Sequence, residues 1–149
     1  MDQSSHFEEL GAEADRDGVQ RFVVGAVVQR DGKVLLLRRP ENDFMGGIFE
    51  LPSGKVEAGE ALDSALIREV KEETGLDVAA IRDYLGCFDY TSGSGKKSRQ
   101  FNFAVDVIIA EPVMLQEHDA YTWSALADEP PVTDAVKVII GKYRELQSE

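Results

Sequence analysis

Residues 54–76, GKVEAGEALDSALIREVKEETGL, join a glycine-containing loop to a helix that carries a dense acidic face. Apolar residues at roughly helical spacing predict the buried side of that helix: Leu62, Ala65, Leu66 and Val70. Glu69, Glu72 and Glu73 lie at positions i, i+3 and i+4, so their carboxylates converge on one side. Like charges at this spacing destabilise a helix, which predicts that something neutralises them.

A hard divalent cation is one way to neutralise the three glutamates. Mg²⁺ and Mn²⁺ take carboxylate and carbonyl oxygens and are commonly held jointly by protein and substrate phosphates. The alternative is a solvated acidic helix face, which is the more frequent arrangement for three clustered glutamates alone. The residues around the glutamates decide between the two.

The whole stretch resembles the signature of the Nudix hydrolases. The matching residues are Gly54, Glu60, Arg68, Glu69, Val70, Glu72, Glu73, Gly75 and Leu76. In that family the loop, helix and loop bind metals that bridge a diphosphate. Water attacks one phosphorus, and a nucleoside diphosphate linked to another moiety is cut. The resemblance is specific over residues 54–76 and generic over the rest of residues 21–147.

The resemblance implies a metal site for Mg²⁺ or Mn²⁺. Glu72, Glu73 and the backbone carbonyl of Gly54 are the implied ligands. Glu69 is implied as a further ligand or as the group that polarises the attacking water. Glu69 and Glu73 are therefore candidate catalytic residues.

Arg68 is expected to support this site by pairing with a carboxylate, either Glu60 or Glu69. Its guanidinium is always charged and offers a planar fork that holds a carboxylate in one rotamer. Glu60 then orients its neighbours rather than reacting. Gly54 is expected to let the loop approach the metal, and Gly75 to end the helix in a left-handed conformation.

A second feature resembling the family is Glu117-His118 before Trp123. Nudix proteins commonly carry an acidic residue, often as Glu-His, shortly before a tryptophan near the end of the sheet. Glu117 is therefore a candidate extra metal ligand or base. Glu111 and Asp119 lie nearby and keep the assignment open.

Basic residues occur at two places where they could meet substrate phosphates. Arg38 and Arg39 end an expected strand, where Nudix proteins often contact phosphate; a surface ion pair is the alternative. Lys96, Lys97 and Arg99 form a basic cluster in a Gly/Ser-rich loop. That cluster is either a solubilising loop tip or a lid that adds positive charge against the substrate.

Strand patterns flank the signature helix. An apolar run at 21–29 and a second at 34–39 are separated by Asp31-Gly32, which predicts a tight hairpin. Residues 48–51 predict a short strand, and residues 77–91 and 101–110 predict two more. The run at 101–110 could form an edge, so a homodimer stays open.

Helical and irregular patterns occupy the two ends of the chain. Residues 1–20 are polar and acidic without a sustained apolar face, which predicts a loose arm or a short surface helix ahead of a domain at 21–149. After Pro130-Pro131, Thr133 or Asp134 is expected to cap a last helix. Its apolar stripe comprises Val136, Ile139, Ile140, Tyr143 and Leu146. This order fits an α/β/α sandwich, and the resemblance implies a mixed β-sheet.

Composition limits the partners. The chain of 149 residues is 43% hydrophobic and 30% charged, as expected of one soluble globular domain. A net charge of −12 argues against a nucleic-acid polymer as partner but not against a small nucleotide, because a bound cation can supply local positive charge.

The compartment is expected to be the cytoplasm. No apolar run approaches the ~20 residues that span a bilayer, and the N-terminus has neither a positive start nor an apolar core. The single Cys87 excludes an intrachain disulfide and is expected to pack in the core rather than to act as a nucleophile.

Substrate markers favour a MutT-like nucleoside triphosphate pyrophosphohydrolase. The ADP-ribose and dinucleoside-polyphosphate branches of the family carry a proline or a tyrosine downstream of the signature, where this chain has Thr91-Ser92-Gly93-Ser94. Thr133-Asp134 stands where the oxidised-purine enzyme has an amide, so oxidised dGTP is unsupported. The alternatives are an ADP-ribose, nucleotide-sugar or dinucleoside polyphosphate pyrophosphatase, or a non-catalytic nucleotide-sensing module. The intact glutamates argue against the sensing module.

Overall fold

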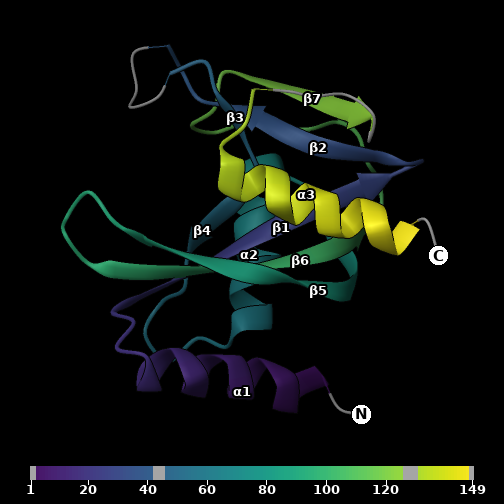
Figure 1. Cartoon of the computed structure of the whole chain (residues 1–149). Helices are drawn as coiled ribbons and strands as arrows, with labels where there is room; N and C mark the ends of the chain where they lie inside the picture. Colours follow the sequence, from purple (N-terminus) through teal and green to yellow (C-terminus); the bar gives the residue numbers. More distant parts are fainter. Residues whose placement is uncertain (1–2, 42–45, 126–130, 148–149) are drawn as a thin grey trace.

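A computed structural model describes residues 3–41, 46–125 and 131–147 of the chain (Figure 1). In chain order the elements are α1 (Gln3–Arg16), β1 (Arg21–Arg30), β2 (Lys33–Arg38), β3 (Phe49–Glu50), β4 (Ser53–Lys55), α2 (Leu62–Thr74), β5 (Val78–Thr91), β6 (Lys97–Val107), β7 (Ala120–Ala125) and α3 (Asp134–Gln147). Among these described helices, none is long and apolar enough to cross a membrane.

The strands form one mixed sheet in the order β3-β2-β1-β6-β5, with β4 paired to β1 and β7 paired to β2. The β1–β6 pair is parallel, and the β1–β2, β1–β4 and β5–β6 pairs are antiparallel. This confirms the mixed sheet. Because β6 lies between β1 and β5, the expectation that residues 101–110 could form an edge strand is wrong.

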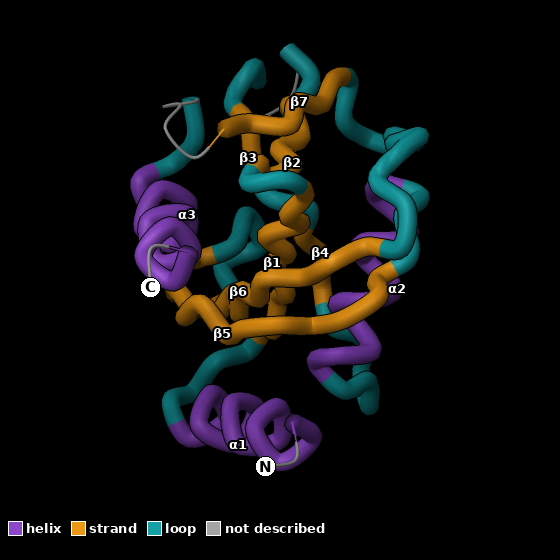
Figure 2. Tube along the Cα trace, turned by 90° about the vertical axis from the view of Figure 1, so that its right-hand side faces the viewer, coloured by secondary structure: helices purple, strands orange, loops and turns teal. Residues whose placement is uncertain are grey.

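Helices cover both faces of the sheet, which confirms the α/β/α sandwich. Side chains alternate along β1, so that Val24, Ala26 and Val28 pack in the cluster under α1 and α2. Val27 instead packs in the cluster under α3. Figure 2 shows α3 and α2 on opposite sides of β1 and β6.

The β1–β2 hairpin confirms the reading of Asp31-Gly32. Arg30 pairs with Lys33, which leaves two residues for the turn. Asp31 has φ 53° and Gly32 has φ 77°, both in the left-handed region that a two-residue hairpin turn requires.

The N-terminal segment is a helix that contributes to the core. Phe7 and Ala14 are buried and Leu10 packs against the same cluster. The ring of Phe7 lies 5.3 Å from that of Phe103, centroid to centroid. The expectation of no sustained apolar face is therefore wrong, because three apolar residues at i, i+3 and i+7 suffice to seat this helix.

Two expected core residues are exposed. Cys87 is an exposed free thiol, because register shifts around Tyr84 and Gly86 break the regular alternation along β5. Leu146 is 40% exposed, because the last turn of α3 follows the buried part of the stripe. Val136, Ile139 and Tyr143 are buried as expected, and the Thr133 hydroxyl accepts a hydrogen bond from the N–H of Val136 at the start of α3.

Candidate active site

Helix α2 places its acidic face beside the loop that precedes it. Leu62, Ala65, Leu66 and Val70 are buried, as the apolar spacing predicts. The helix ends at Gly75, whose φ of 75° is left-handed, and the N–H of Gly75 donates to the carbonyl of Lys71. This confirms the expected glycine cap.

The loop touches the helix at Gly54. Strand β4 pairs with β1 and presses Gly54 against the carboxylate of Glu69. A Cβ atom at position 54 would overlap the Glu69 carboxyl group. Glycine is therefore required here by close approach rather than by an unusual φ.

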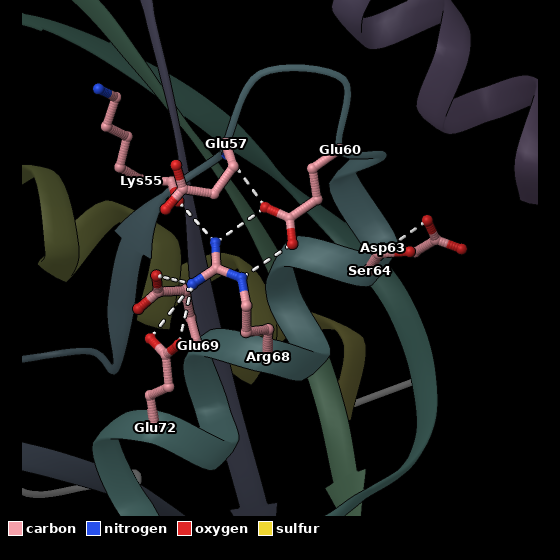
Figure 3. Close-up of polar contacts among 8 residues, drawn as sticks. All are labelled: Lys55, Glu57, Glu60, Asp63, Ser64, Arg68, Glu69 and Glu72. Carbon is pink, nitrogen blue, oxygen red and sulfur yellow. Dashed lines mark hydrogen bonds and ion pairs between the residues drawn. The ribbon is translucent and has the colours of Figure 1, made fainter.

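Arg68 organises the carboxylates on this face (Figure 3). Its Nε and Nη2 each donate to one Glu60 oxygen at 2.8 Å, and Nη1 donates to Glu69 at 2.7 Å. A longer bond of 3.2 Å reaches Glu72, and Nη2 also donates to the carbonyl of Lys55. The expected pairing of Arg68 with Glu60 and Glu69 is confirmed.

The pKa values of Glu60 and Glu69 shift in opposite directions, because Arg68 dominates at Glu60 and burial dominates at Glu69. Hydrogen bonds from Arg68 and from the N–H of Glu57 lower the pKa of Glu60 to about 2. Burial raises the pKa of Glu69 despite the bond from Arg68. Glu60 is therefore a fixed anion that holds Arg68, while Glu69 is the more basic carboxylate of the two.

Glu73 lies deeper, at the junction of α2 with the sheet. The N–H of Ser53 donates to Glu73 Oε1 at 2.6 Å, and His118 Nδ1 lies 3.7 Å from Glu73 Oε2. Burial, with the charges of Glu50 and Glu69, raises the pKa of Glu73 to about 7. The ionised form of Glu73 is thus disfavoured mainly by burial and to a smaller extent by the neighbouring carboxylates.

Glu50 links Arg39 to His118 in a partly buried polar chain, and the sequence analysis did not predict Glu50 or its contact with His118. Arg39 Nε donates to Glu50 Oε1 at 2.9 Å, and His118 Nε2 lies 2.6 Å from Glu50 Oε2. Burial lowers the pKa of His118, but the bond to Glu50 and the charge of Glu73 outweigh it and raise the pKa. Burial likewise raises the pKa of Glu50, and His118 and Arg39 outweigh it and lower the pKa.

These groups open into a cavity of about 610 Å³, a size typical of small-molecule sites. One end is polar and carries Glu50, Gly54, Glu73, Glu117 and His118. The lining also includes the amide of Gln100, the charged side chains of Arg21, Arg39 and Asp89, and a set of apolar and aromatic side chains: Val23, Phe49, Leu51, Phe88, Tyr90 and Val136.

The candidate residues divide between the cavity and its surroundings. Gly54, Glu73, Glu117 and Arg39 line the cavity. Glu69 and Glu72 are not among the described residues that line it, and both bond to Arg68. The roles assigned to these residues from the resemblance stay predictions.

Three of the other four basic candidates bond to other residues of the chain, and the fourth is exposed. Arg38 forms a two-bond pair with Asp119, at 2.7 and 2.9 Å. Arg99 is buried between Asp89 and Asp17. Lys97 Nζ donates to the carbonyl of Asp17, and Lys96 is exposed at the β5–β6 hairpin. None of these four is among the described residues that line the cavity.

The residues fit a hard divalent cation by donor chemistry. Carboxylates and a backbone carbonyl are the donors that Mg²⁺ and Mn²⁺ take. Burial raises the pKa of Glu73, and a cation beside it would favour the ionised carboxylate. Across residues 3–41, 46–125 and 131–147, no three His, Cys, Asp or Glu side chains form a ready-made cluster. Glu69 and Glu72 face Arg68 instead, so they would have to share it with an ion.

Both the sequence and the structure of the chain are similar to those of known proteins. An ADP-ribose pyrophosphatase from Methanocaldococcus jannaschii is 43% identical over 65 residues, which cover 44% of this chain and 37% of the relative. A CTP pyrophosphohydrolase from Escherichia coli is 43% identical over 63 residues, covering 42% and 46%. The matched segments span less than half the length of either relative.

A solved structure and a family model extend the match along the chain. The crystal structure of a MutT protein from Methanosarcina mazei superposes with a TM-score of 0.74 at 27% identity, over 87% of this chain and 96% of the other. The model of the NUDIX domain matches residues 19–138, which contain the sheet, the α2 signature and the cavity. The chain therefore belongs to the NUDIX domain family.

Proposed function

We propose that the protein is a metal-dependent hydrolase that cuts the phosphoanhydride of a nucleoside diphosphate linked to another moiety, and that its substrate is a nucleoside triphosphate. The observation that carries the proposal is the position of Glu73, whose partly buried carboxylate lies at the cavity beside the Gly54 loop. Its pKa is raised to about 7 in a cavity that it shares with Glu50 and Glu117. A group of carboxylates on one cavity suits a divalent cation brought in with a diphosphate.

The chain's own residues would divide the work. Glu69, Glu72, Glu73 and the carbonyl of Gly54 would hold Mg²⁺ or Mn²⁺. When bound, the cation supplies charge neutralisation at the diphosphate and acidifies a water. Arg68 keeps Glu69 in one orientation, and Glu60 fixes Arg68.

Two carboxylates are suited to receive a proton from the attacking water. Glu69 has a raised pKa and lies against the Gly54 loop. Glu117 lines the same cavity as Gly54 and Glu73. Because the remaining contribution is positioning and preorganised charge, small displacements of either carboxylate are expected to be costly.

The choice of a triphosphate rests on the sequence markers and on the relatives. The downstream markers of the ADP-ribose and dinucleotide branches are absent from residues 91–94. A CTP pyrophosphohydrolase and a MutT protein are among the similar proteins.

ADP-ribose is the second candidate substrate, because an ADP-ribose pyrophosphatase is 43% identical over the segment that it shares with this chain. The products separate the two. A triphosphate cut between its α- and β-phosphates gives a nucleoside monophosphate and pyrophosphate, whereas ADP-ribose gives AMP and ribose 5-phosphate.

The test is product analysis of the purified protein with Mg²⁺ and with EDTA, over nucleoside triphosphates, oxidised dGTP, nucleotide sugars, ADP-ribose and dinucleoside polyphosphates. Pyrophosphate and a monophosphate from a triphosphate, in Mg²⁺ alone, are expected. Cleavage of ADP-ribose or sugar-linked substrates only would keep the mechanism and replace the substrate. Nucleotide binding without any cleavage would identify a sensing module instead.

A further inference from the structure

One wall of the cavity is built from three neighbouring strands. Gln100 on β6 is paired in register with Val23 on β1 and with Phe88 on β5. Tyr90 follows two residues after Phe88, and the two rings lie 6.2 Å apart, centroid to centroid. All four side chains line the cavity, so one amide is set among an aliphatic and two aromatic side chains.

The orientation of the Gln100 amide is fixed by the buried amide of Asn102, and we call these two hydrogen-bonded amides the amide ladder. Asn102 Nδ2 donates to the carbonyl of Gly86 at 3.2 Å and to that of Gln100 at 3.1 Å. Turning the Asn102 amide over would set its oxygen against two carbonyl oxygens. Asn102 Oδ1 is therefore held toward Gln100, whose Nε2 donates to it at 2.8 Å.

The ladder fits because β1 has a glycine beside it. Gly25 pairs with Asn102 in the parallel β1–β6 register. A Cβ atom on Gly25 would overlap both Asn102 Oδ1 and Gln100 Nε2. The two amides therefore occupy the space that a side chain at position 25 would take.

This arrangement leaves the oxygen of Gln100 as the outward group. Within the described part of the chain, no hydrogen bond to Gln100 Oε1 is found, and the one buried side-chain polar atom without a partner is His118 Nδ1. Since Gln100 lines the cavity, its Oε1 atom is accessible from there. The ladder thus presents a hydrogen-bond acceptor of defined direction between Phe88 and Val23.

We propose that Gln100 Oε1 accepts a hydrogen bond from an exocyclic amino group of the substrate's base, so that the site selects cytosine or adenine over their carbonyl counterparts uracil and hypoxanthine. The proposal rests on the proposed function, in which the phosphates occupy the acidic end. Base rings suit the Phe88 and Tyr90 side of the cavity, because aromatic side chains stack on base faces. A carbonyl oxygen in place of the amino group would face Oε1 and repel it.

The first test compares kcat/KM for CTP against UTP and for ATP against ITP. The preferred pair is expected to favour the amino base by roughly tenfold or more in the wild type. Gln100→Met removes the acceptor at similar length and is expected to bring that ratio close to one. Gln147→Met, on the exposed end of α3, is the matched control and should leave the ratio unchanged.

Ratios near one in the wild type would overturn the proposal, as would an unchanged ratio in a folded Gln100→Met variant. A preference for UTP or ITP would also overturn it, because the amide would then present its N–H. The wild type supplies a second test if the variant does not fold. N4,N4-dimethyl-CTP has no N–H at the amino position and is expected to lose the preference over UTP; turnover equal to that of CTP contradicts the assignment.

The proposed function can fail separately. If no nucleotide is hydrolysed in Mg²⁺, the affinities of the wild type for CTP and UTP, measured by calorimetry, still test whether Gln100 Oε1 accepts a hydrogen bond from the base. Tighter binding of CTP, abolished by Gln100→Met, would keep the base assignment while the catalytic one falls. Equal binding of CTP and UTP, together with the lack of hydrolysis, would overturn both the base assignment and the catalytic assignment.

Discussion

Arg68 holds both oxygens of Glu60, with Nε and Nη2 each at 2.8 Å, while its third nitrogen reaches Glu69 at 2.7 Å. One guanidinium thereby links the loop that begins the signature to the carboxylate nearest Gly54. The fork needs three donors in one plane, which lysine lacks.

Arg68→Lys is therefore expected to reduce kcat/KM by about 10- to 100-fold, the usual effect of losing a group that orients a metal ligand or catalytic residue. The thermal midpoint should fall as well, because the Arg68 side chain is only 28% exposed and its bonds to Glu60 and Glu69 are partly buried. Steady-state kinetics and a Mg²⁺ titration check this. Arg144→Lys, on the exposed end of α3, serves as control, and equal kinetics for the two variants would show that the fork is dispensable.

Gly54→Ala is expected to displace the Glu69 carboxylate, because the added methyl group would occupy its position. Overpacking of this kind costs about 1–3 kcal/mol of unfolding free energy. Activity should fall more steeply than stability. Gly93→Ala is the matched change, since no atom lies within 4 Å of a Cβ there. Denaturant melts and turnover of both variants separate the two effects, and a fully active Gly54→Ala would contradict the close approach.

Gly25→Ala is expected to push Gln100 and Asn102 apart and to lower stability by about 1–3 kcal/mol. Gly141→Ala, in the interior of α3 with open space at the Cβ position, should instead stabilise by up to about 1 kcal/mol. Thermal melts read both changes. Unchanged stability in Gly25→Ala would mean that the amides of Gln100 and Asn102 can move aside without loss of stability, and would contradict the close packing at Gly25.

The pair of Asp89 with Arg99 predicts an acid-side stability effect. The hydrogen bonds from Arg99 lower the pKa of Asp89 below its ordinary value. The unfolded chain therefore binds the proton first as pH falls, so the pair stabilises fully above the unfolded pKa of about 3.9. The contribution disappears as pH falls through the lower folded value.

Urea melts of the wild type and Asp89→Asn between neutral pH and pH 3 measure this contribution. The two stability curves should differ near neutrality and converge in acid. A constant difference between the two curves over the whole range would show that Arg99 does not lower the pKa of Asp89 in the folded protein.

The signature helix and the first hairpin could be predicted from sequence because their determinants are local. The spacing of Leu62, Ala65, Leu66 and Val70 defines the buried face of α2, and the caps and turns at Gly75 and Asp31-Gly32 act on their own neighbours. Arg68 finds Glu69 as an adjacent residue and Glu60 eight residues away.

The rest of the site depends on strand register, which the sequence does not reveal. Glu50 and His118 are 68 positions apart and meet because β2 pairs with both β3 and β7. Gln100 reaches the cavity through its pairing with Val23 and Phe88. Glu50, just ahead of the signature loop, had the one local signal, a charged residue between Phe49 and Leu51 in an apolar run.

Strand register also explains why the partners of the basic residues could not be predicted from sequence. Arg99 and Gln100 are neighbours on β6, but alternation sends them to opposite faces. Arg99 meets Asp89 and Asp17, while Gln100 lines the cavity. The sequence shows that Arg99 is charged, but it does not show that Asp89 and Asp17 are its partners in the fold.

The most direct measurement of the central claim is Mg²⁺-dependent nucleotide turnover by Glu73→Gln beside Glu145→Gln, which changes an exposed glutamate on α3. With both variants shown to be folded by circular dichroism, Glu73→Gln is expected to lose turnover while Glu145→Gln retains it. Turnover by Glu73→Gln at the wild-type rate would contradict the assignment of the site.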